Sequence, residues 1–440
     1  MSSSTVWPVN SNEKKLDVVI VGGGVCGTVC AIALARRGIY PHVYEAAAKF
    51  GEIGAGIVVG YNAVRILRSI GVFHDILKHA GEDPKDPSTL NKTFRFFSGM
   101  DGHELVYDYP HDLEGGNFGI ARSVFLDALI GHIDPNHTHF NKRCTSVTQP
   151  VPGTNSRSIV HFSDGTSVEA DVVLLANGIR GSGREAVTGR DPKEDVVFSN
   201  VVCYRGLVPV EEAKKVGVKA DLDKRPACFM GIDKHLIMFP IRGGKVINIV
   251  AFVIDRTVDV GAIRLPSDHP LVVPVTKEEM LKEYEGWGSD VIGVLSCIEN
   301  PNKWYINVVY PPLMAYAKGR VALLGDAAHG MTPHLGAGAG QGIEDAYLLS
   351  RLLAHPQTTV ESIPDIFDIY SQIRRPRAQS VWDGSLRASN IYEGYGEHGS
   401  SNEGRVQDLT GLWSFVWHHN ADDDYIEART LLEERGVFKV

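Results

Sequence analysis

The first patterned segment of the chain alternates between strand-like and helical spacing of apolar residues. Leu16 to Gly22 is a short, mostly β-branched run, which is typical of a buried strand. Apolar residues then keep helical spacing from Val25 to Arg37, Gly38 ends that pattern, and His42 to Tyr44 is strand-like again. These residues predict a β-α-β unit, and an amphipathic helix with one buried face follows at residues 61–70.

The middle of the chain has a different pattern. Between about Asp195 and Arg256, extended apolar runs are separated by turn residues that include Gly243 and Gly244. This spacing predicts a second domain built of antiparallel strands.

The last third of the chain is expected to return to the first domain. Thr276 and Glu279 form a capping box ahead of a helical stretch to residue 284. A buried strand at residues 320–326 then leads into a glycine-rich turn, and the pattern predicts a helix from Gly342 to Leu353. From Ile366 onward the chain is mostly helical and charged.

Composition narrows the class of protein. The 440 residues carry 44 basic and 53 acidic side chains, a net charge of -9, without a basic stripe, so we expect no nucleic-acid partner.

No stretch reaches the ~18 uncharged apolar residues of a membrane span, and no signal-peptide pattern is present, so we expect no membrane span and a cytoplasmic protein. Six cysteines without C-x-x-C pairing are expected to be buried thiols in a reducing compartment. The oligomeric state stays open between monomer and homodimer.

Gly22, Gly24 and Gly27 form a G-x-G-x-x-G motif between the first strand and the first helix. The first glycine permits a tight turn, the second lets a pyrophosphate approach the backbone, and the third lets the helix pack against the strand. Glu45 ends the next strand, 18 positions after Gly27 (45 minus 27), where a carboxylate can accept hydrogen bonds from an adenosine ribose. Together these residues predict a dinucleotide site.

A second glycine-rich element favours FAD over NAD. Gly325 and Asp326 follow a buried strand, and the run M-T-P-H-L-G-A-G-A-G-Q-G-I-E-D-A then opens a helix near Gln341, whose first amides can meet an electron-rich ring or an anion. Asp326 is expected at a strand end, where it can bond a polyol chain. A flavin with its ribityl chain needs such a second site, whereas an NAD-only dehydrogenase does not.

These motifs, in this order, resemble those of the single-component FAD-dependent aromatic hydroxylases, the family of salicylate hydroxylase and 4-hydroxybenzoate hydroxylase. The resemblance covers roughly residues 15–390 and includes A-N-G-I-R at residues 176–180 and P-H-L-G-A-G. E-I-G-A-G-I at residues 52–57 and Y-R-G-L at residues 204–207 are more similar to the salicylate-hydroxylase branch. The chain departs from the family at Asn177, where the usual residue is an aspartate between the flavin and the nicotinamide cofactor, and in the serine that here stands at 182.

The resemblance implies an α/β fold. It consists of a Rossmann-type FAD-binding domain, an inserted antiparallel-sheet substrate domain and a helical C-terminal region. We expect three parts of the FAD-binding domain at residues 15–82, 113–190 and 297–365, substrate-domain strands at 83–112 and 191–296, and the helical region at 366–440.

The resemblance also implies a reaction with a small aromatic substrate, oxygen and NADH or NADPH as co-substrate. In the family, the nicotinamide reduces the flavin and a flavin hydroperoxide hydroxylates the ring. The resemblance implies a small phenolic acid as the substrate, with decarboxylation of salicylate or 4-hydroxybenzoate. Phe239 stands before a proline where dearomatising relatives often have tyrosine, which favours a simple benzoate. A dearomatising phenol hydroxylase of polyketide biosynthesis, an FAD-binding regulatory module without turnover, and a reductase or oxidase without oxygen insertion remain alternatives.

Candidate site residues fall into a cofactor group and a substrate group, and Arg122 enters the first through the resemblance. For FAD we expect Gly22, Gly24, Val25, Cys26, Gly27, Glu45, Ala46, Gly56, Arg122, Asn177, Gly178, Gly325, Asp326, Pro333, Gly336, Ala337 and Gly338. For the substrate we expect His334, Tyr204 and Arg205 as catalytic residues, with His235, Met238, Phe239, Phe252, Pro333 and Gly336 around the ring. Because side chains alternate along a strand, Tyr204 and Arg205 cannot both face the flavin without a bulge, and we favour Tyr204.

Some substrate candidates also have a purely structural interpretation. Arg205 could pair with a surface carboxylate, and His235 could be a solvated loop histidine. Met238 and Phe239 could belong to the core.

Two further clusters are interpreted structurally. The run R-R-P-R at residues 374–377 is expected to be a solvated face or a helix-end pairing. His329 and His334 have no third ligand at a suitable spacing, so we expect no metal site.

Overall fold

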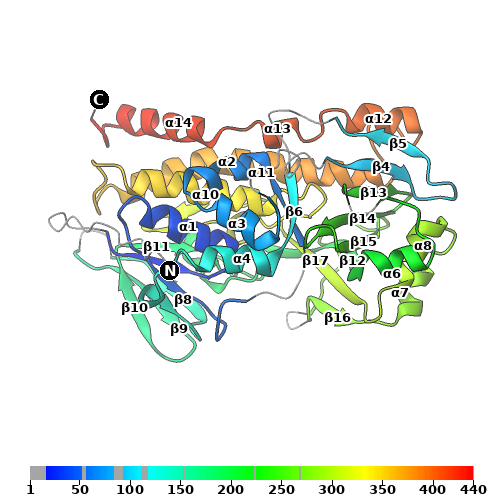
Figure 1. The fold of residues 1–440 in the computed structure, drawn as a ribbon. Coiled ribbons are helices and arrows are strands. Elements are labelled where there is room, and N and C mark those ends of the chain that lie inside the picture. Colours follow the sequence, from blue (N-terminus) through cyan, green and yellow to red (C-terminus); the bar gives the residue numbers. More distant parts are fainter. Residues whose placement is uncertain are drawn as a thin grey trace.

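A six-stranded sheet forms the centre of one half of the protein (Figure 1). The structure is a computed structural model that describes residues 16–51, 56–83, 93–110, 117–151, 154–221, 224–266 and 269–439. The strand order is β18-β19-β11-β1-β2-β7, and β1 lies parallel to both β2 and β11. The strands are β1 (Val18–Val21), β2 (His42–Tyr44), β7 (Thr138–His139), β11 (Val172–Leu175), β18 (Ala317–Lys318) and β19 (Val321–Leu323). The chain leaves β1 toward one neighbour and later returns to its other side, and ligands bind at the carboxyl ends of strands at such a switch point.

Helices and two small sheets surround this central sheet. The β-α-β unit predicted from the sequence is present, and its helix α1 (Val25–Ala35) packs against α10 (Gly338–Leu353). The neighbouring helices are α2 (Tyr61–Ser69), α3 (Phe73–Ala80), α4 (Arg122–Ile130), α5 (Glu185–Thr188) and α9 (Asp326–His329), with 3-10 turns η2 (Pro135–His137) and η3 (Ser182–Arg184). The small sheets are β3 (Gly56–Gly60) with β6 (Asn117–Ala121), and β8 (Cys144–Thr148) with β9 (Ser158–Phe162) and β10 (Ser167–Ala170).

The other half contains an eight-stranded sheet with the order β16-β17-β12-β15-β14-β13-β4-β5. Its pairs are antiparallel except β13 with β4. The strands are β4 (Arg95–Ser98), β5 (Leu105–Asp108), β12 (Val196–Pro209), β13 (Ala227–Met230), β14 (Lys234–Ile241), β15 (Val246–Ile254), β16 (Val272–Pro274) and β17 (Asn302–Val309). We expected this domain to end at residue 296, but β17 pairs with β12 and extends the sheet to Val309.

Helices cover one face of the eight-stranded sheet and form a separate core with it. They are α6 (Val210–Lys215), α7 (Lys277–Glu283) and α8 (Ser289–Ser296). One of the two hydrogen bonds of the predicted capping box at α7 is observed: the hydroxyl of Thr276 accepts from the Glu279 amide at 3.1 Å.

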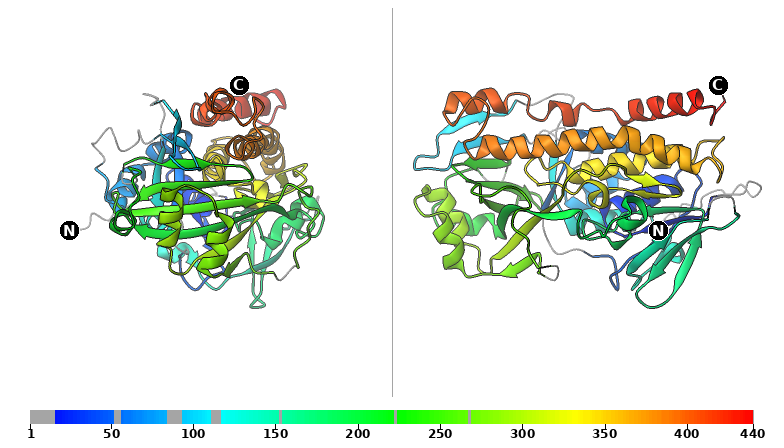
Figure 2. Two further views of the ribbon diagram at one scale, coloured as in Figure 1. Left: turned by 90° about the vertical axis from the view of Figure 1, so that its right-hand side faces the viewer. Right: turned by 180° about the vertical axis from the view of Figure 1, so that it is seen from behind.

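The C-terminal region is helical, as predicted, and its first helix begins at Ile363. This helix, α11 (Ile363–Tyr392), runs along both halves of the protein, and α12 (Asn402–Leu409), α13 (Ser414–Trp417) and α14 (Ala421–Glu434) lie beside it (Figures 1 and 2). The C-terminal region therefore contacts both sheets at once.

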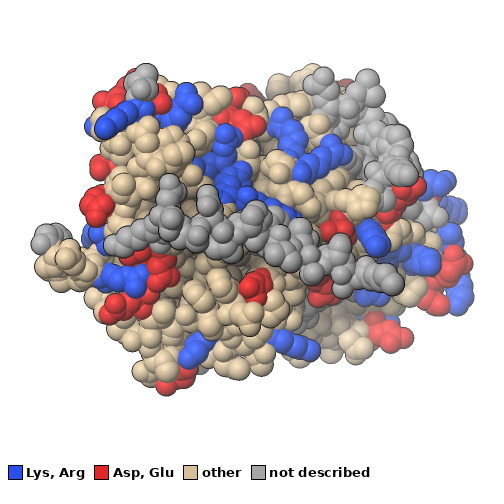
Figure 3. Space-filling model, turned by 60° about the vertical axis from the view of Figure 1, so that its left-hand side comes forward, with Lys and Arg blue, Asp and Glu red and all other residues tan. Residues whose placement is uncertain are grey.

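Charged side chains are unevenly spread over the surface. On the face drawn in Figure 3, one group of lysine and arginine side chains lies near the middle, and further basic and acidic side chains are interspersed around it. Among the helices of the described ranges, none combines the length and the hydrophobicity that crossing a bilayer requires.

Candidate functional site

The first glycine-rich turn is built by backbone atoms in close contact. Gly22 has φ +107°, a conformation that favours glycine, and its amide donates to the Tyr44 carbonyl at 2.8 Å. A Cβ atom on Gly27 would lie 1.9 Å from the Gly22 carbonyl oxygen, so only glycine lets α1 approach β1 here. These two residues shape the turn, as the sequence predicted from their spacing.

Glu45 lies at the end of β2, beside this turn. One of its carboxylate oxygens accepts from the Gly23 amide at 2.7 Å and the other from the Ala47 amide at 2.8 Å, and Ala46 lies between. A carboxylate offers about four acceptor sites, so these two bonds leave capacity for a ribose hydroxyl. The hydrogen bonds also fix the orientation of the carboxylate before any ligand binds.

The second glycine-rich turn places Asp326 at the first position of α9. Gly325 has φ +61° and ψ -144°, a backbone conformation for glycine, and a Cβ atom there would lie 2.7 Å from the Sγ of Cys26. Its amide donates to Asp345 Oδ2 at 2.9 Å. The turn is thus held from behind while Asp326 faces a cavity.

A cavity of about 330 Å³ joins the two glycine-rich turns to the eight-stranded sheet. Ten of the expected cofactor residues line it: Gly24, Val25, Cys26, Gly56, Arg122, Gly178, Asp326, Pro333, Gly336 and Gly338. Gly22, Gly27, Glu45, Ala46, Asn177, Gly325 and Ala337 are not part of its lining.

The floor of the cavity is the start of α10. This helix begins at Gly338, three residues earlier than the expected Gln341 (341 minus 338), and its first turn has no acidic residue. Its free amides therefore present the positive end of the helix dipole to the cavity. At one end of the cavity, the backbone of the glycine-rich turn fits the pyrophosphate of FAD. The Asp326 carboxylate fits the ribityl chain, and the start of α10 fits the flavin ring.

Asn177 has a different environment from the cavity residues. Its Oδ1 is buried without a hydrogen-bond partner among the described residues, and the side chain lies where a Cβ atom on Gly181 would be. The E-I-G-A-G-I segment lies partly outside the described residues, which include only Gly56 and Ile57 of it.

The substrate end of the cavity is lined by one face of the eight-stranded sheet. Its side chains come from alternate positions of three strands, with one residue from β17: Cys203, Arg205, Ile237, Phe239, Val250, Phe252 and Ile306. Arg205 donates to the Gly56 carbonyl at 3.3 Å, and its Nε is buried without a partner among the described residues. The guanidinium also lies over the ring of Trp304, 5.3 Å from its centroid. A cation thus lies within a largely apolar wall.

Two expected substrate residues lie on the other face of this sheet. Tyr204 and Met238 are buried in the core formed with α7 and α8, and the Tyr204 hydroxyl lies 3.4 Å from Glu279. No bulge separates Tyr204 from Arg205, so their side chains alternate and Arg205 takes the cavity side. Our preference for Tyr204 was therefore wrong, and Met238 is a core residue.

His334 and His235 form a buried pair at the cavity. The Nδ1 of His334 lies 3.4 Å from the Nε2 of His235, and the Nδ1 of His235 lies 2.9 Å from Glu393 Oε1. Burial and the neighbouring His235 lower the pKa of His334 to about 3, so its ring is neutral near neutral pH. Its Nε2 is buried without a partner among the described residues, and His334 lines the cavity. The interpretation of His235 as a solvated loop histidine is wrong, since its side chain is fully buried.

Glu393 is a residue that sequence reasoning missed. It lies at the end of α11, is fully buried, and binds Arg256 and Ser389 in addition to His235. Burial raises its pKa, but His235, His334 and Arg256 together lower it below the usual value, so it is a carboxylate. No local signal marks it, because its charged partner Arg256, which follows β15, and His235 of β14 lie more than 130 positions earlier in the chain. The apolar residues Cys203, Ile237 and Val250 could have been found by counting two positions from Arg205, Phe239 and Phe252.

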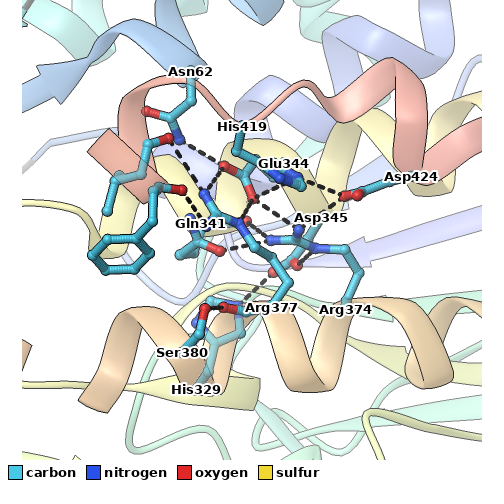
Figure 4. Close-up of polar contacts among 12 residues, drawn as sticks. Asn62, His329, Gln341, Glu344, Asp345, Arg374, Arg377, Ser380, His419 and Asp424 are labelled. Atoms are coloured by element: carbon cyan, nitrogen blue, oxygen red, sulfur yellow. Dashed lines mark hydrogen bonds and ion pairs between the residues drawn. The ribbon is translucent and has the colours of Figure 1, made fainter. Parts of the chain in front are cut away.

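The run R-R-P-R is not a solvated face. Arg374 is fully buried and binds Glu344 and Asp345 of α10, while Arg377 binds Glu344 (Figure 4). The interpretation from sequence failed because the acidic partners lie about 30 positions earlier in the chain.

One group of side chains in the described ranges has the geometry of a metal site: Glu344, His419 and Asp424. The carboxylate oxygens of this group already accept hydrogen bonds from Arg374 and Arg377. Two cations therefore occupy the place that a metal ion would take.

A family model described as an FAD binding domain matches residues 15–203 and 296–385. A salicylate hydroxylase of Pseudomonas putida is 35% identical over 435 residues, which cover 96% of this chain and 97% of the relative. A 6-methylsalicylate 1-monooxygenase of Aspergillus terreus is 32% identical and covers 93% of this chain and 89% of its own length. A solved salicylate hydroxylase substrate complex has a TM-score of 0.82 at 29% identity and covers 95% of this chain and 98% of that one.

Proposed function

Because the chain belongs to the FAD-dependent aromatic monooxygenases and is salicylate-hydroxylase-like, we propose that it hydroxylates a hydroxybenzoate at the carbon that bears the carboxylate. One oxygen atom of O2 enters the ring and the other leaves as water, the carboxylate leaves as carbon dioxide, and NADH or NADPH donates the electron pair. When bound, FAD supplies the electron transfer and the oxygen activation. The residues of the chain bind and orient the substrate, exclude water and accept a hydrogen bond from its hydroxyl.

The observation that carries this proposal is that Arg205 and His334 line the same largely apolar cavity. Burial lowers the pKa of Arg205, and Arg122 lowers it further, but a guanidinium stays charged at neutral pH. A buried cation whose Nε has no partner among the described residues favours an anionic ligand, and a benzoate carboxylate supplies one. The apolar walls of Phe252, Ile237 and Val250 suit the ring.

His334 is proposed as the hydrogen-bond acceptor for the phenol hydroxyl. The Glu393 carboxylate accepts from His235 Nδ1, so His235 Nε2 carries the lone pair and accepts from His334 Nδ1. This assignment, made from the hydrogen-bond network, leaves His334 Nε2 as an unprotonated acceptor toward the cavity. A hydrogen bond that the phenol hydroxyl donates to this nitrogen makes the substrate ring more electron-rich, which favours attack on an electrophilic oxygen.

For the cofactor, we propose that Glu45 binds the adenosine ribose and Asp326 binds the ribityl chain. Replacing Asp326 with alanine should weaken FAD retention during gel filtration, and a fully yellow, active variant would show that the ribityl site lies elsewhere. We also propose that Asn177 affects the handling of the nicotinamide. An unchanged apparent affinity for NADH and NADPH in Asn177→Asp would show that the missing charge does not matter.

Stopped-flow reduction of the holoenzyme tests the substrate class. NADH or NADPH is mixed with the oxidised enzyme in the presence of salicylate, 4-hydroxybenzoate, benzoate or phenol. We expect a hydroxybenzoate to accelerate flavin reduction and to yield a dihydroxy product with loss of carbon dioxide. Benzoate, which lacks the hydroxyl group, and phenol, which lacks the carboxylate, should accelerate flavin reduction less. If no hydroxybenzoate accelerates reduction and no hydroxylated product forms, the proposal fails.

A further inference from the structure

A buried cluster of charged residues lies between α10 and α11, and none of its members lines the cavity (Figure 4). We call it the α10–α11 charge cluster and define it as Glu344, Asp345, Arg374, Arg377 and Asp424. Arg374, Glu344 and Asp345 have no exposed surface. The burial raises the pKa of Glu344, but Arg374 and Arg377 lower it to about 2, so the cluster consists of ions.

Arg374 uses all five of its N–H donors within this cluster and its surroundings. Its Nε donates to Asp345 Oδ1 at 2.8 Å. One terminal nitrogen donates to Glu344 at 2.8 Å and to Asp424 at 3.1 Å, and the other donates to the carbonyl and the side-chain oxygen of Gln341 at 3.2 and 2.9 Å. The rigid fork of the guanidinium therefore fixes the position of the Asp345 carboxylate relative to the first turns of α10.

The second oxygen of Asp345 reaches the flavin side of the protein. Asp345 Oδ2 accepts from the Gly325 amide at 2.9 Å and lies 2.6 Å from His329 Nε2. Gly325 is the residue with φ +61° that directs Asp326 into the cavity, and His329 ends the same short helix. Both ends of α9 are thus attached to one carboxylate, which Arg374 orients from the opposite side.

Stability alone is a weak reason for such a cluster. Replacing a buried ion pair with well-packed apolar residues is often neutral or stabilising, because desolvation offsets the attraction. A charged pair with fixed geometry does, however, hold a neighbouring group in place, and here that group is the turn that carries Asp326.

We propose that Arg374 is a positioning residue for FAD, which acts through Asp345 to hold the Gly325–Asp326 turn in the conformation that binds the cofactor. Arg374 does not line the cavity. The inference concerns FAD binding, so its test needs no aromatic substrate and is independent of the proposed reaction.

The matched variants are Arg374→Lys and Arg377→Lys. Both keep the charge of the cluster and shorten one guanidinium to an ammonium, but Arg377 binds Glu344 and does not bind Asp345. Titration of each apoprotein with FAD, followed by flavin fluorescence, should give a dissociation constant at least tenfold higher than wild type for Arg374→Lys and less than threefold higher for Arg377→Lys. The double variant Arg374→Lys/Asp345→Asn should have nearly the same dissociation constant for FAD as the weaker-binding single variant, because both changes break the same connection.

Equal losses of FAD affinity in the two lysine variants, or an Arg374→Lys affinity within threefold of wild type, would overturn the proposal. The wild-type protein offers a second test if the variants do not fold. Hydrogen exchange of a peptide that covers residues 321–330 should be slow already in the apoprotein, because Asp345 binds the Gly325 amide before FAD arrives. Exchange within seconds in the apoprotein, with protection only after FAD is added, contradicts the proposed role.

Discussion

The face on which a side chain lies decides the chemistry at the substrate end of the cavity. Arg205 and Tyr204 are neighbours in β12, yet the first lines the cavity and the second lies in the core on the other face. Because side chains alternate along a strand, only one of the two could line the cavity. The sequence does not reveal the register of β12 against β15, so it could not show which of the two does. The same alternation places His235, Ile237 and Phe239 on one face of β14.

Replacing Arg205 with glutamine should weaken binding of a hydroxybenzoate by roughly 10- to 100-fold, since a hydrogen bond to a charged group contributes about 1.5–3 kcal/mol. Phenol, which has no carboxylate, should bind wild type and variant alike. Perturbation of the flavin absorbance on titration with each ligand measures both dissociation constants. Equal weakening for salicylate and phenol would mean that Arg205 does not bind the carboxylate.

Replacing His334 with glutamine should lower turnover by roughly 10- to 100-fold, because a hydrogen bond to a group that gains negative charge contributes about 1.5–3 kcal/mol, without loss of FAD on gel filtration. Because the pKa of His334 is lowered to about 3, the unprotonated ring is present at every pH well above that value. The turnover of the wild-type enzyme should therefore show no acid limb near pH 6.5 from this group. A limb near that pH that disappears in His334→Gln would contradict the neutral state of this residue.

His334 should also make the wild-type protein sensitive to acid. Its pKa is about 3 when folded and about 6.5 when unfolded, so between these values the unfolded chain binds more protons and the free energy of unfolding falls as pH falls. Urea denaturation of wild type and His334→Gln at pH 7 and pH 5 isolates this contribution. The variant should gain stability relative to wild type by up to about 2 kcal/mol at pH 5, and a difference that does not change with pH would contradict the burial of a neutral ring.

Among the helices and strands, the close approach of α1 to β1 depends on one residue, Gly27. Adding a Cβ atom at Gly27 would place it 1.9 Å from a backbone oxygen, whereas Gly131, at the end of α4, has 3.8 Å to its nearest neighbour and φ -59°. Gly27→Ala should thus destabilise the fold by at least ~1–3 kcal/mol, as overpacking does, and release FAD, while Gly131→Ala stays close to wild type. Thermal unfolding with and without FAD measures both effects; similar melting temperatures for the two variants would speak against this packing.

The type and order of the elements around the first turn could be predicted because their signals are local. The strand, glycine motif, helix and strand of residues 16–44 follow hydrophobic spacing, and both glycine-rich turns follow motifs. The start of α10 at Gly338 was placed three residues late because glycine has a low helix propensity and the packing of α1 against α10 overrides it.

In the whole molecule, the contacts between charged residues far apart in the chain could not be predicted from the sequence. The partners of Arg374 come from α10 and α14, and those of His235 come from the end of α11 and the loop before α10. Such contacts depend on how the C-terminal helices lie along both halves, which no local period encodes. The candidate FAD residues could be proposed because they carry local motifs, whereas Arg374 and Glu393 have no local signal in the sequence.

FAD should stabilise the whole protein, because it binds residues that only the folded chain brings together. At a free FAD concentration of 100 times the dissociation constant, binding adds about 2.7 kcal/mol to the free energy of unfolding. The melting temperature of the apoprotein should accordingly rise steadily with added FAD in a calorimetric titration. Riboflavin, which has no adenosine diphosphate part, should raise it less at equal concentration, and an equal rise would mean that the Glu45 end contributes nothing.

We propose that this flavoprotein inserts an oxygen atom into a hydroxybenzoate ring with loss of the carboxylate. Turnover of salicylate under oxygen-18 gas with NADH or NADPH, followed by mass spectrometry of the product and of released carbon dioxide, tests it most directly. We predict catechol with one labelled oxygen atom, and one molecule of unlabelled carbon dioxide for each catechol. Oxidation of the nicotinamide with salicylate recovered intact, or a hydroxylated product without the label, would contradict the account.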